Sequence, residues 1–358
     1  MAALAPSGEE PTLKNRLKRS AARWGFPVEF ESLRPGQPKD PVQPSAAQGQ
    51  AVDSLATPAT PGQTAKGKEK MTCTPGGEVT LGTLKSSSWN YAPSSGYDLT
   101  HTRAYRPKPF PRLWMRTATD PVAVNPHKTA LLVIDVQNYF LSRALGHHHN
   151  PLHTAEETLR EVAIPAARTA GIQVIHLTWG FSQAEAKSAP PALLRRFTPW
   201  FQKMTAGSGS SQRQSTGSSK SAEHHGDGSA DRSTLGDEMG PVTLWNGQII
   251  SAGEKLIRGA WNADLYESMR RDFIASADTP LPDARFYKTR ASGFFSEGGG
   301  IPDIVKWLRS KGITTLLIGG VGTEEGVWAT ARDAGNWGFD VVLLADGCGT
   351  TAGLDGGG

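Results

Sequence analysis

Asp135 and Lys288 are the two charged residues whose positions best suit acid–base chemistry. Asp135 ends the apolar run "TALLVID" at 129–135, and Lys288 ends a short run at 284–288 that is followed by "TRASGFF". A carboxyl group beside an amine lets each hold the other's charge and positions a proton donor or acceptor. Alone, the aspartate is as readily a helix cap and the lysine a solvated surface residue. If the fold brings them into one pocket, we expect a catalytic pair.

A glycine-rich turn is the third candidate element. The sequence "GGVGTEEG" at 319–326 joins a predicted strand to a predicted helix, so Val321, Gly322 and Thr323 could orient a substrate through backbone N–H groups. We expect Thr323 to cap the helix. Glu324 and Glu325 suit the positive end of that helix and would repel an anionic substrate. The alternative is an ordinary strand-to-helix turn.

Two further residues are candidate substrate contacts. Asn138 follows Asp135 by three positions, and Trp179 ends the apolar run "IQVIHLTW" at 172–179. Trp179, with Trp261 and Trp328, could line a pocket for a flat substrate. These tryptophans are equally well explained as packing residues.

Alternating strand and helix signals must position these residues. Apolar runs of strand length occur at 129–135, 172–179, 284–288, 314–321 and 340–346, and helical patterns are predicted at 154–171, 262–275, 302–311 and 324–334. We expect Pro165 to kink or split the first of these helices. Such alternation predicts an α/β fold with a mostly parallel sheet covered on both faces. Ligands bind such sheets beyond the carboxyl ends of the strands, where the candidate residues fall.

Composition divides the chain and excludes some functions. Residues 1–87 and the Ser/Gly-rich stretch 206–236 carry few periodic apolar positions, so we expect a disordered tail and a flexible insert within a domain at 88–358. The net charge of +4 is spread along the chain, which argues against nucleic-acid binding. No apolar run is long enough for a membrane helix, and two cysteines fit a reducing compartment. We therefore expect a cytoplasmic protein with no membrane association.

The sequence resembles the isochorismatase-like (cysteine hydrolase) family, and its motifs are most similar to those of fungal members. The resemblance covers about residues 88–351 and rests on motifs in family order: "TALLVIDVQNYFL", "IHLTWGF", "GEKLIRGAWNADLY", "KTRASGFF" and "LLIGGVGTEEGVWATARDAGNWGFDVVLLADGCGTT". It implies a three-layer α/β/α sandwich. It also implies a final helix after "GCGTT", whereas this sequence reads "AGLDGGG". Either the sequence is incomplete, or we expect one sheet face to be partly uncovered.

The resemblance assigns roles to three positions. Many members use an Asp–Lys–Cys set, in which Asp135 and Lys288 match the first two members and Gly326 stands where the cysteine belongs. A glycine cannot form a covalent intermediate, so an amidase mechanism through this position is excluded. One interpretation is a hydrolase of small molecules that uses Asp/Lys acid–base chemistry, as in vinyl-ether hydrolysis. The alternative is a catalytically degenerate member that acts as a binding or interaction protein.

Metal and cofactor signals are weak. His147, His148, His149 and His153 could suggest a metal, but the resemblance implies an Asp-x-His element for zinc, and "HLTWGF" does not continue into one. Cys348 could be a relocated thiol, although a packing role fits it better. We expect no metal and no cofactor, a small-molecule substrate as partner, and, from the resemblance, a homo-oligomer.

Overall fold

The protein is described by a computed structural model that covers residues 71–73, 77–82, 88–101, 111–147, 152–198 and 233–350. Most of the predicted tail, most of the predicted insert and residues 351–358 lie outside these ranges. The helices in the described part of the chain are all too short or too polar to cross a lipid bilayer.

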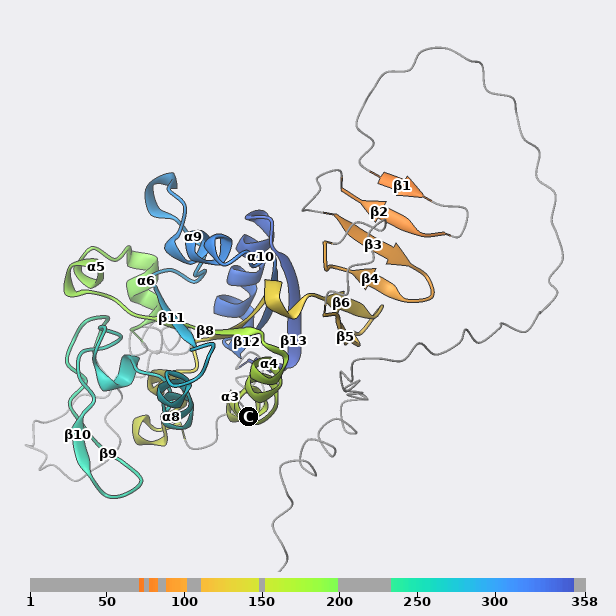
Figure 1. Cartoon of the computed structure of the whole chain (residues 1–358). Coiled ribbons are helices and arrows are strands. Elements are labelled where there is room, and N and C mark those ends of the chain that lie inside the picture. The colour runs from red at the N-terminus through yellow and green to blue at the C-terminus, as the bar shows by residue number, and fades with distance from the viewer. Residues whose placement is uncertain are drawn as a thin grey trace, which may run out of the picture.

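A five-stranded parallel sheet forms the centre of the main body (Figure 1). Its strands are β7 (Thr129–Ile134), β8 (Gln173–Trp179), β11 (Ala284–Lys288), β12 (Thr315–Val321) and β13 (Asp340–Gly349). The spatial order is β11-β8-β7-β12-β13, and every neighbouring pair is parallel. Every residue of β7, β8 and β12 is buried, which is why these strands read as continuous apolar runs.

Helices cover both faces of this sheet (Figure 1). They are α2 (Asn138–Leu141), α3 (Leu152–Thr158), α4 (Ile164–Ala170), α5 (Gln183–Lys187), α6 (Pro191–Arg196), α8 (Glu267–Ser276), α9 (Asp303–Ser310) and α10 (Trp328–Asn336). Apolar side chains of α9 and α10 form one core with the sheet, and those of α3, α4 and α8 form the other. The predicted three-layer α/β fold is confirmed.

The helix predicted at 154–171 differs from expectation at its start and its middle. It begins at Leu152 and passes through a π-helical turn, Leu159–Ala163, before continuing as α4. The N–H of Ile164 donates to the carbonyl of Leu159, five residues back. This wider turn carries the chain past Pro165, which has no N–H to donate, so the helix is neither split nor ended there. Gly171 ends it with φ 73°, a left-handed cap.

The helix predicted at 262–275 begins later than expected. Trp261–Ala263 form a short 3₁₀ turn, and α8 starts at Glu267. Leu265 is therefore outside the helix and pairs with Gln137 in an isolated bridge. Leu265, Met269 and Phe273 nevertheless all pack into the same core, so the apolar spacing was informative although the boundary was wrong.

A second sheet lies before the main body and was not expected. Its strands are β1 (Met71–Cys73), β2 (Val79–Leu81), β3 (Trp89–Ala92), β4 (Gly96–Asp98), β5 (Leu113–Met115) and β6 (Val122–Val124). Two of them precede residue 88, inside the segment predicted to be a disordered tail. Their short length and sparse apolar content explain why the sequence did not indicate them.

Asp340, at the start of β13, attaches the second sheet to the main body. Its carboxylate accepts from Trp89 Nε1 at 2.7 Å and from Thr315 Oγ1 at 3.1 Å, and it lies 2.6 Å from His101 Nε2. Val342 packs against the apolar residues of the second sheet. One carboxylate thus links both sheets.

The last residues of the stretch 206–236, which was predicted to be a flexible insert, belong to the described part of the chain. Residues 233–236 are described, and Leu235 is buried against the cluster that contains Phe181 and Phe197. Lys255 is fully buried and donates to the carbonyls of Phe197, at 3.3 Å, and Ser233, at 2.8 Å. It therefore holds together the two chain segments that flank the insert.

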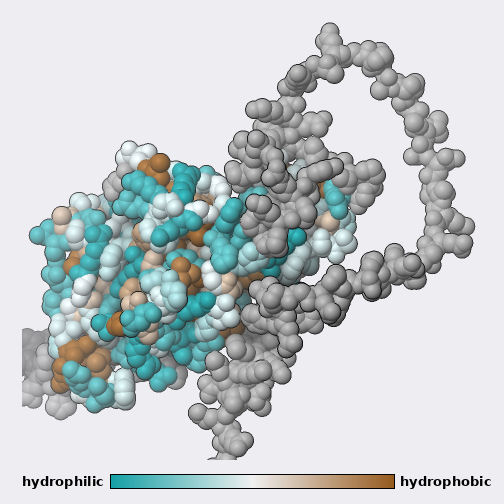
Figure 2. Space-filling model, viewed as in Figure 1, coloured by the Kyte–Doolittle hydropathy of each residue, from teal (hydrophilic) through white to brown (hydrophobic). Residues whose placement is uncertain are grey.

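A hairpin follows the insert and projects from the body (Figure 1). It consists of β9 (Pro241–Thr243) and β10 (Ile249–Ser251). Trp245 and Ile249 are among its most exposed side chains, at 87% and 70%. Figure 2 shows a mostly hydrophilic face with several scattered hydrophobic groups, one of which lies towards the hairpin.

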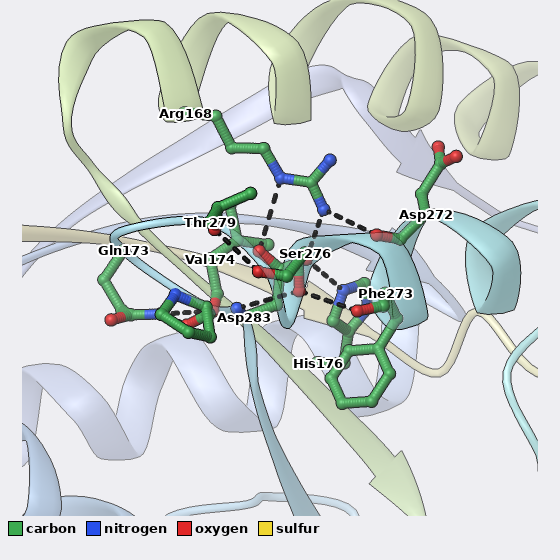
Figure 3. A network of polar contacts seen from close by, with 10 residues as sticks. Arg168, Gln173, Val174, His176, Asp272, Phe273, Ser276, Thr279 and Asp283 are labelled. Atoms are coloured by element: carbon green, nitrogen blue, oxygen red, sulfur yellow. Dashed lines mark hydrogen bonds and ion pairs between the residues drawn. The ribbon is translucent and has the colours of Figure 1, made fainter.

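A buried polar network fixes α4 and α8 to the sheet at the end away from the candidate residues (Figure 3). Asp283 is the centre of this network. Its carboxylate accepts from Arg168 Nη2 at 2.6 Å and lies 3.3 Å from His176 Nε2. Burial lowers the pKa of His176, so the ring is held neutral near pH 7. The network has a structural role.

Candidate active site

Three neighbouring strands place Asp135, Trp179 and Lys288 at one edge of the sheet. Lys288 is the last residue of β11 and is in register with Trp179, the last residue of β8. Asp135 follows the last residue of β7, on the other side of β8. The parallel order therefore brings together residues that are 153 positions apart in the chain.

The structure joins Asp135 and Lys288 in a buried ion pair. Lys288 Nζ lies 2.9 Å from Asp135 Oδ2. The Lys288 side chain is 1% exposed and the Asp135 side chain is 4% exposed. The ammonium also donates to the carbonyl of Ala291 at 3.0 Å and lies 3.7 Å from the centroid of the Trp179 ring. The pair is thus dry, and an aromatic face and one carbonyl assist in holding the ammonium.

Burial shifts the pKa of both partners towards the uncharged forms. It raises the pKa of the Asp135 carboxyl above its ordinary value, although the Lys288 ammonium acts in the opposite direction. It lowers the pKa of Lys288 to about 8, against the opposing influence of Asp135. Each group therefore exchanges a proton more readily near neutral pH than it would in water.

Asp135 has a strained backbone and a free acceptor atom. Its φ is 58°, which aspartate tolerates but rarely adopts. Its Oδ1 atom is buried and has no hydrogen-bond partner among the described residues, and neither has Nε1 of Trp179. The indole N–H is near enough to the carboxyl to lower its pKa slightly, but the two do not form a hydrogen bond. An unpaired donor and an unpaired acceptor therefore remain beside the ion pair.

Gln137 holds this arrangement in place and was not indicated by the sequence. It is fully buried. Its Nε2 donates to the carbonyls of Trp179 and Ala263, and its Oε1 accepts from the Trp179 N–H, all at 2.8 Å. The side chain thus ties the end of β8 to the segment that follows Asp135. An isolated glutamine after a strand carries no signal that could have revealed this role.

Gln137→Leu is expected to lower the free energy of unfolding by about 3 kcal/mol, because it removes three buried hydrogen bonds to backbone groups, two of them to the N–H and the carbonyl of Trp179. Urea unfolding followed by circular dichroism measures the change. Gln248→Leu is the matched control, since Gln248 is exposed in the hairpin turn and should leave the urea midpoint nearly unchanged. Equal midpoints for the two variants would show that Gln137 does not support the site.

Gly326 lies directly against the ion pair. A Cβ atom at this position would lie 2.6 Å from Asp135 Oδ2 and 3.3 Å from Lys288 Nζ. The first distance is shorter than real Cβ contacts allow. A side chain at position 326 would therefore require the Asp135 carboxylate to shift.

The glycine-rich turn approaches the pair but is not capped as predicted. Val321 is the buried last residue of β12, Gly322 has φ 73°, and a π-helical turn, Thr323–Val327, follows. Thr323 does not cap this turn, because its hydroxyl donates to the carbonyl of Gly349 at 2.9 Å. The prediction of a threonine cap is wrong, and the hydroxyl instead links the turn to the end of β13.

Asn138 lies at a different cavity. Its Nδ2 donates to the carbonyl of Trp261 at 2.8 Å, and its Oδ1 is buried without a partner among the described residues. The cavity that it lines is also bordered by His153, Tyr266 and Trp245, and the described lining includes neither Asp135 nor Lys288. Asn138 is thus three residues from the catalytic candidate in sequence but faces another space.

Arg196 is a site residue that the sequence analysis missed. Its guanidinium carbon lies 5.2 Å from the centroid of the Trp179 ring. Nη2 of the same group forms an ion pair with the Glu325 carboxylate. It is also near enough to influence the pKa of Asp135 and of Lys288. A basic residue at the end of a short helix is ordinarily a solvated cap, so only the fold reveals this position.

Cys348 and the histidines do not assemble a second site among the described residues. Cys348 lies within β13 rather than after it, and burial raises the pKa of its thiol to about 11, so the thiol is protonated at neutral pH. In the part of the chain that the structure describes, no group of three or more metal-binding side chains comes together. His148 and His149 lie outside the described residues.

Comparisons with known proteins agree with the motif pattern. Residues 247–355 match the isochorismatase domain. The ureidoacrylate amidohydrolase RutB of Variovorax paradoxus is 26% identical over 232 residues, which cover 63% of this chain and 71% of that protein. The nicotinamidase/pyrazinamidase of Mycobacterium tuberculosis is 33% identical over 79 residues, or 21% of this chain and 42% of that protein. Among solved structures, a cysteine hydrolase from Pseudomonas syringae pv. phaseolicola aligns with a TM-score of 0.39 at 16% identity, covering 68% of this chain and 79% of that one.

Proposed function

Because the chain belongs to the isochorismatase-like family of hydrolases, we propose that it hydrolyses a small molecule by acid–base chemistry of Asp135 and Lys288, without a thiol nucleophile. The observation that carries the proposal is the dry ion pair set against Gly326, with Lys288 Nζ 2.9 Å from Asp135 Oδ2. Glycine at position 326 has no side chain that could act as a nucleophile. Thiol-based amide hydrolysis through that position is therefore not proposed.

The free oxygen of Asp135 suits a proton donor. Oδ2 accepts from Lys288, so when the carboxyl is protonated its hydrogen belongs on Oδ1, which has no other partner among the described residues. Burial raises the pKa of Asp135 and lowers that of Lys288, so transfer of the shared proton from the ammonium to the carboxylate is easier here than in water. Asp135 can then donate its proton, and Lys288 can return a proton to it at the end of the cycle.

Vinyl-ether hydrolysis is the reaction class that these features support. Oδ1–H of Asp135 protonates the enol-ether carbon, which leaves an oxocarbenium ion beside the aspartate carboxylate. Water adds to the cationic carbon and loses its proton to the Asp135–Lys288 pair. The resulting hemiketal breaks its carbon–oxygen bond to give a ketone and an alcohol. No covalent bond to the protein forms at any step.

Activity is expected to fall as pH rises above about 8. The pair loses its last shared proton as Lys288 titrates, and burial places the pKa of Lys288 at about 8. Below that pH the proton is present and Asp135 can act as the acid, whereas above it the acid form disappears. A pH profile of kcat/KM with an uncharged enol ether measures the descending limb. A profile that stays flat to pH 10, as an unshifted lysine would allow, contradicts the assignment.

Purified protein tests the function against two substrate panels, uncharged enol ethers and uncharged amides. We expect turnover of enol ethers, and mass spectrometry of the protein during turnover should detect no covalent adduct. An adduct, or amide turnover without enol-ether turnover, contradicts the mechanism. Inactivity on both panels would favour the alternative, in which the scaffold serves as a binding or interaction protein.

A further inference from the structure

Trp179 and Lys288 lie side by side because their strands pair in register. Lys288 on β11 is the partner of Trp179 on the neighbouring parallel strand β8, and the N–H of Gly180 donates to the carbonyl of Lys288 at 3.1 Å. Side chains alternate between the two faces of a strand, so residues in register on parallel strands point to the same face of the sheet. The register of the sheet therefore places the ammonium against the indole ring.

The Lys288 ammonium has three N–H groups and two oxygen partners among the described residues. Nζ lies 2.9 Å from Asp135 Oδ2 and 3.0 Å from the carbonyl oxygen of Ala291. It also lies over the face of Trp179, 3.7 Å from the ring centroid. An aromatic face attracts a desolvated cation more strongly than an exposed one. The ring therefore supplies the contact that a third oxygen atom would otherwise supply.

The ring of Trp179 is enclosed by protein. The residue is fully buried. Phe181 stacks near the ring, with centroids 5.9 Å apart, and Phe197 lies nearly perpendicular to it, with centroids 5.1 Å apart. Rings packed in this way keep a fixed position. We therefore assign the face of Trp179 to the ammonium rather than to stacking on a flat substrate.

Two charged groups on other elements act on the same ammonium. Burial has the largest effect on the pKa of Lys288 and lowers it, the Asp135 carboxylate raises it, and the Arg196 guanidinium lowers it further. Arg196 also lies over the Trp179 ring, but its guanidinium carbon is 5.2 Å from the centroid, compared with 3.7 Å for Lys288 Nζ. The nearer cation gains more from the ring, so the ring favours the proton on Lys288.

We propose that Trp179 is a positioning residue, whose face holds the Lys288 ammonium and thereby keeps the shared proton in the Asp135–Lys288 pair. The proposal rests on the proposed function in that it names a residue that supports the same pair. When Lys288 loses its proton, the ring loses a cation and gains no other partner, so the contact opposes deprotonation. Trp179 acts through Lys288 and needs no contact with the substrate.

Titration of Lys288 in Trp179→Phe and Trp179→Leu tests the proposal without a substrate. Phenylalanine keeps an aromatic face, whereas leucine has none. Both replacements remove the indole N–H, which lies near the Asp135 carboxyl, so the difference between them reports the aromatic face. Trp114→Leu is the matched control, because Trp114 is half exposed on β5 in the second sheet. Nuclear magnetic resonance of the lysine side chains in the full chain gives the midpoints.

The midpoint of Lys288 should be about one pH unit lower in Trp179→Leu than in Trp179→Phe, a loss of proton affinity of about tenfold. Trp114→Leu should keep the wild-type midpoint. The descending limb of kcat/KM with an enol ether should move to lower pH with the midpoint. A purely structural role would give the opposite sign, because looser packing admits water and raises the pKa of a buried lysine.

Equal midpoints in the two Trp179 variants, or a higher midpoint in Trp179→Leu, would overturn the proposal. Trp179→Met fills more of the space without a ring and should titrate as the leucine variant does. Failure of both non-aromatic variants to fold, while Trp179→Phe folds, would show that the residue serves packing and would also overturn it. Inactivity on enol ethers with the expected midpoints would instead overturn only the proposed function.

Discussion

Asp135→Asn is expected to lower kcat/KM for an enol ether by a factor of about 10³, within the range that a positioned general acid contributes. The amide keeps the shape of the side chain but has no acidic proton to give to the substrate carbon. Lys288 keeps its proton in this variant, but its ammonium faces Oδ2 of the native carboxyl rather than the unpaired Oδ1 that is aligned as the donor.

Asparagine is the appropriate replacement at this position for a structural reason. The φ of 58° at residue 135 lies in the left-handed region, which asparagine adopts more readily than most residues. The backbone turn should therefore survive, and the loss of rate will report the missing proton. The variant also leaves Lys288 without its carboxylate, so its amine should become neutral at a lower pH.

Circular dichroism and thermal unfolding of the same variant serve as the control for folding. If Asp135→Asn folds as the wild type does and retains full kcat/KM, Asp135 is not the acid. A folded variant with lost activity but unchanged substrate affinity fits the proposal, because the change then affects the chemical step alone.

Gly326→Ala is expected to lower kcat/KM by about 10²-fold or more. The new Cβ would lie 2.6 Å from Asp135 Oδ2, so the carboxylate must move away and its contact with Lys288 must lengthen. A displacement of about 1 Å at a reacting group can cost about 100-fold in rate. The pKa of Lys288 should also change, which the acid–base titration of the variant would record.

Gly335→Ala is the matched control for this substitution. Gly335 lies in α10, where an added Cβ would meet nothing within 4 Å. Alanine has the higher helix propensity, so this control should be neutral or slightly stabilising. Comparable losses of activity in both variants would show that the effect at position 326 is not specific to the Asp135 contact.

Gly326→Cys follows from the same geometry. We expect it to lose activity towards enol ethers without gaining amidase activity, because the cysteine also carries the obstructing Cβ. A strong gain of amidase activity would show that the Asp135 carboxylate moves aside easily, and would contradict the rigid contact on which the Gly326→Ala prediction depends.

The main sheet and the ion pair could be predicted because their signals are local. Each of β7, β8 and β12 is a continuous apolar run, and parallel strands place their carboxyl ends at one edge. Asp135 follows the end of β7 and Lys288 ends β11, so their meeting required only the correct strand order. The glycine at position 326 was recognised from the motif, whereas its contact with the Asp135 carboxylate required coordinates.

Other features could not be predicted because their signals are not local. Gln137 and Arg196 gain their roles from partners far away in the chain, and neither residue type is unusual where it occurs. Thr323 fits a helix cap by sequence, but the carbonyl of Gly349, brought near by β13, takes its hydroxyl. The strands before residue 88 are only three residues long, too short for periodicity to indicate them.

The titration of Lys288 tests the central claim, a dry proton-sharing pair beside Gly326, most directly. Nuclear magnetic resonance of the lysine side chains, with Lys288 assigned through Lys288→Met, gives its midpoint in the wild type and in Asp135→Asn. The account predicts a wild-type midpoint of about 8, and a different midpoint once the carboxylate is absent. A midpoint near 10.5, the ordinary value for lysine, that is identical in both proteins would contradict it.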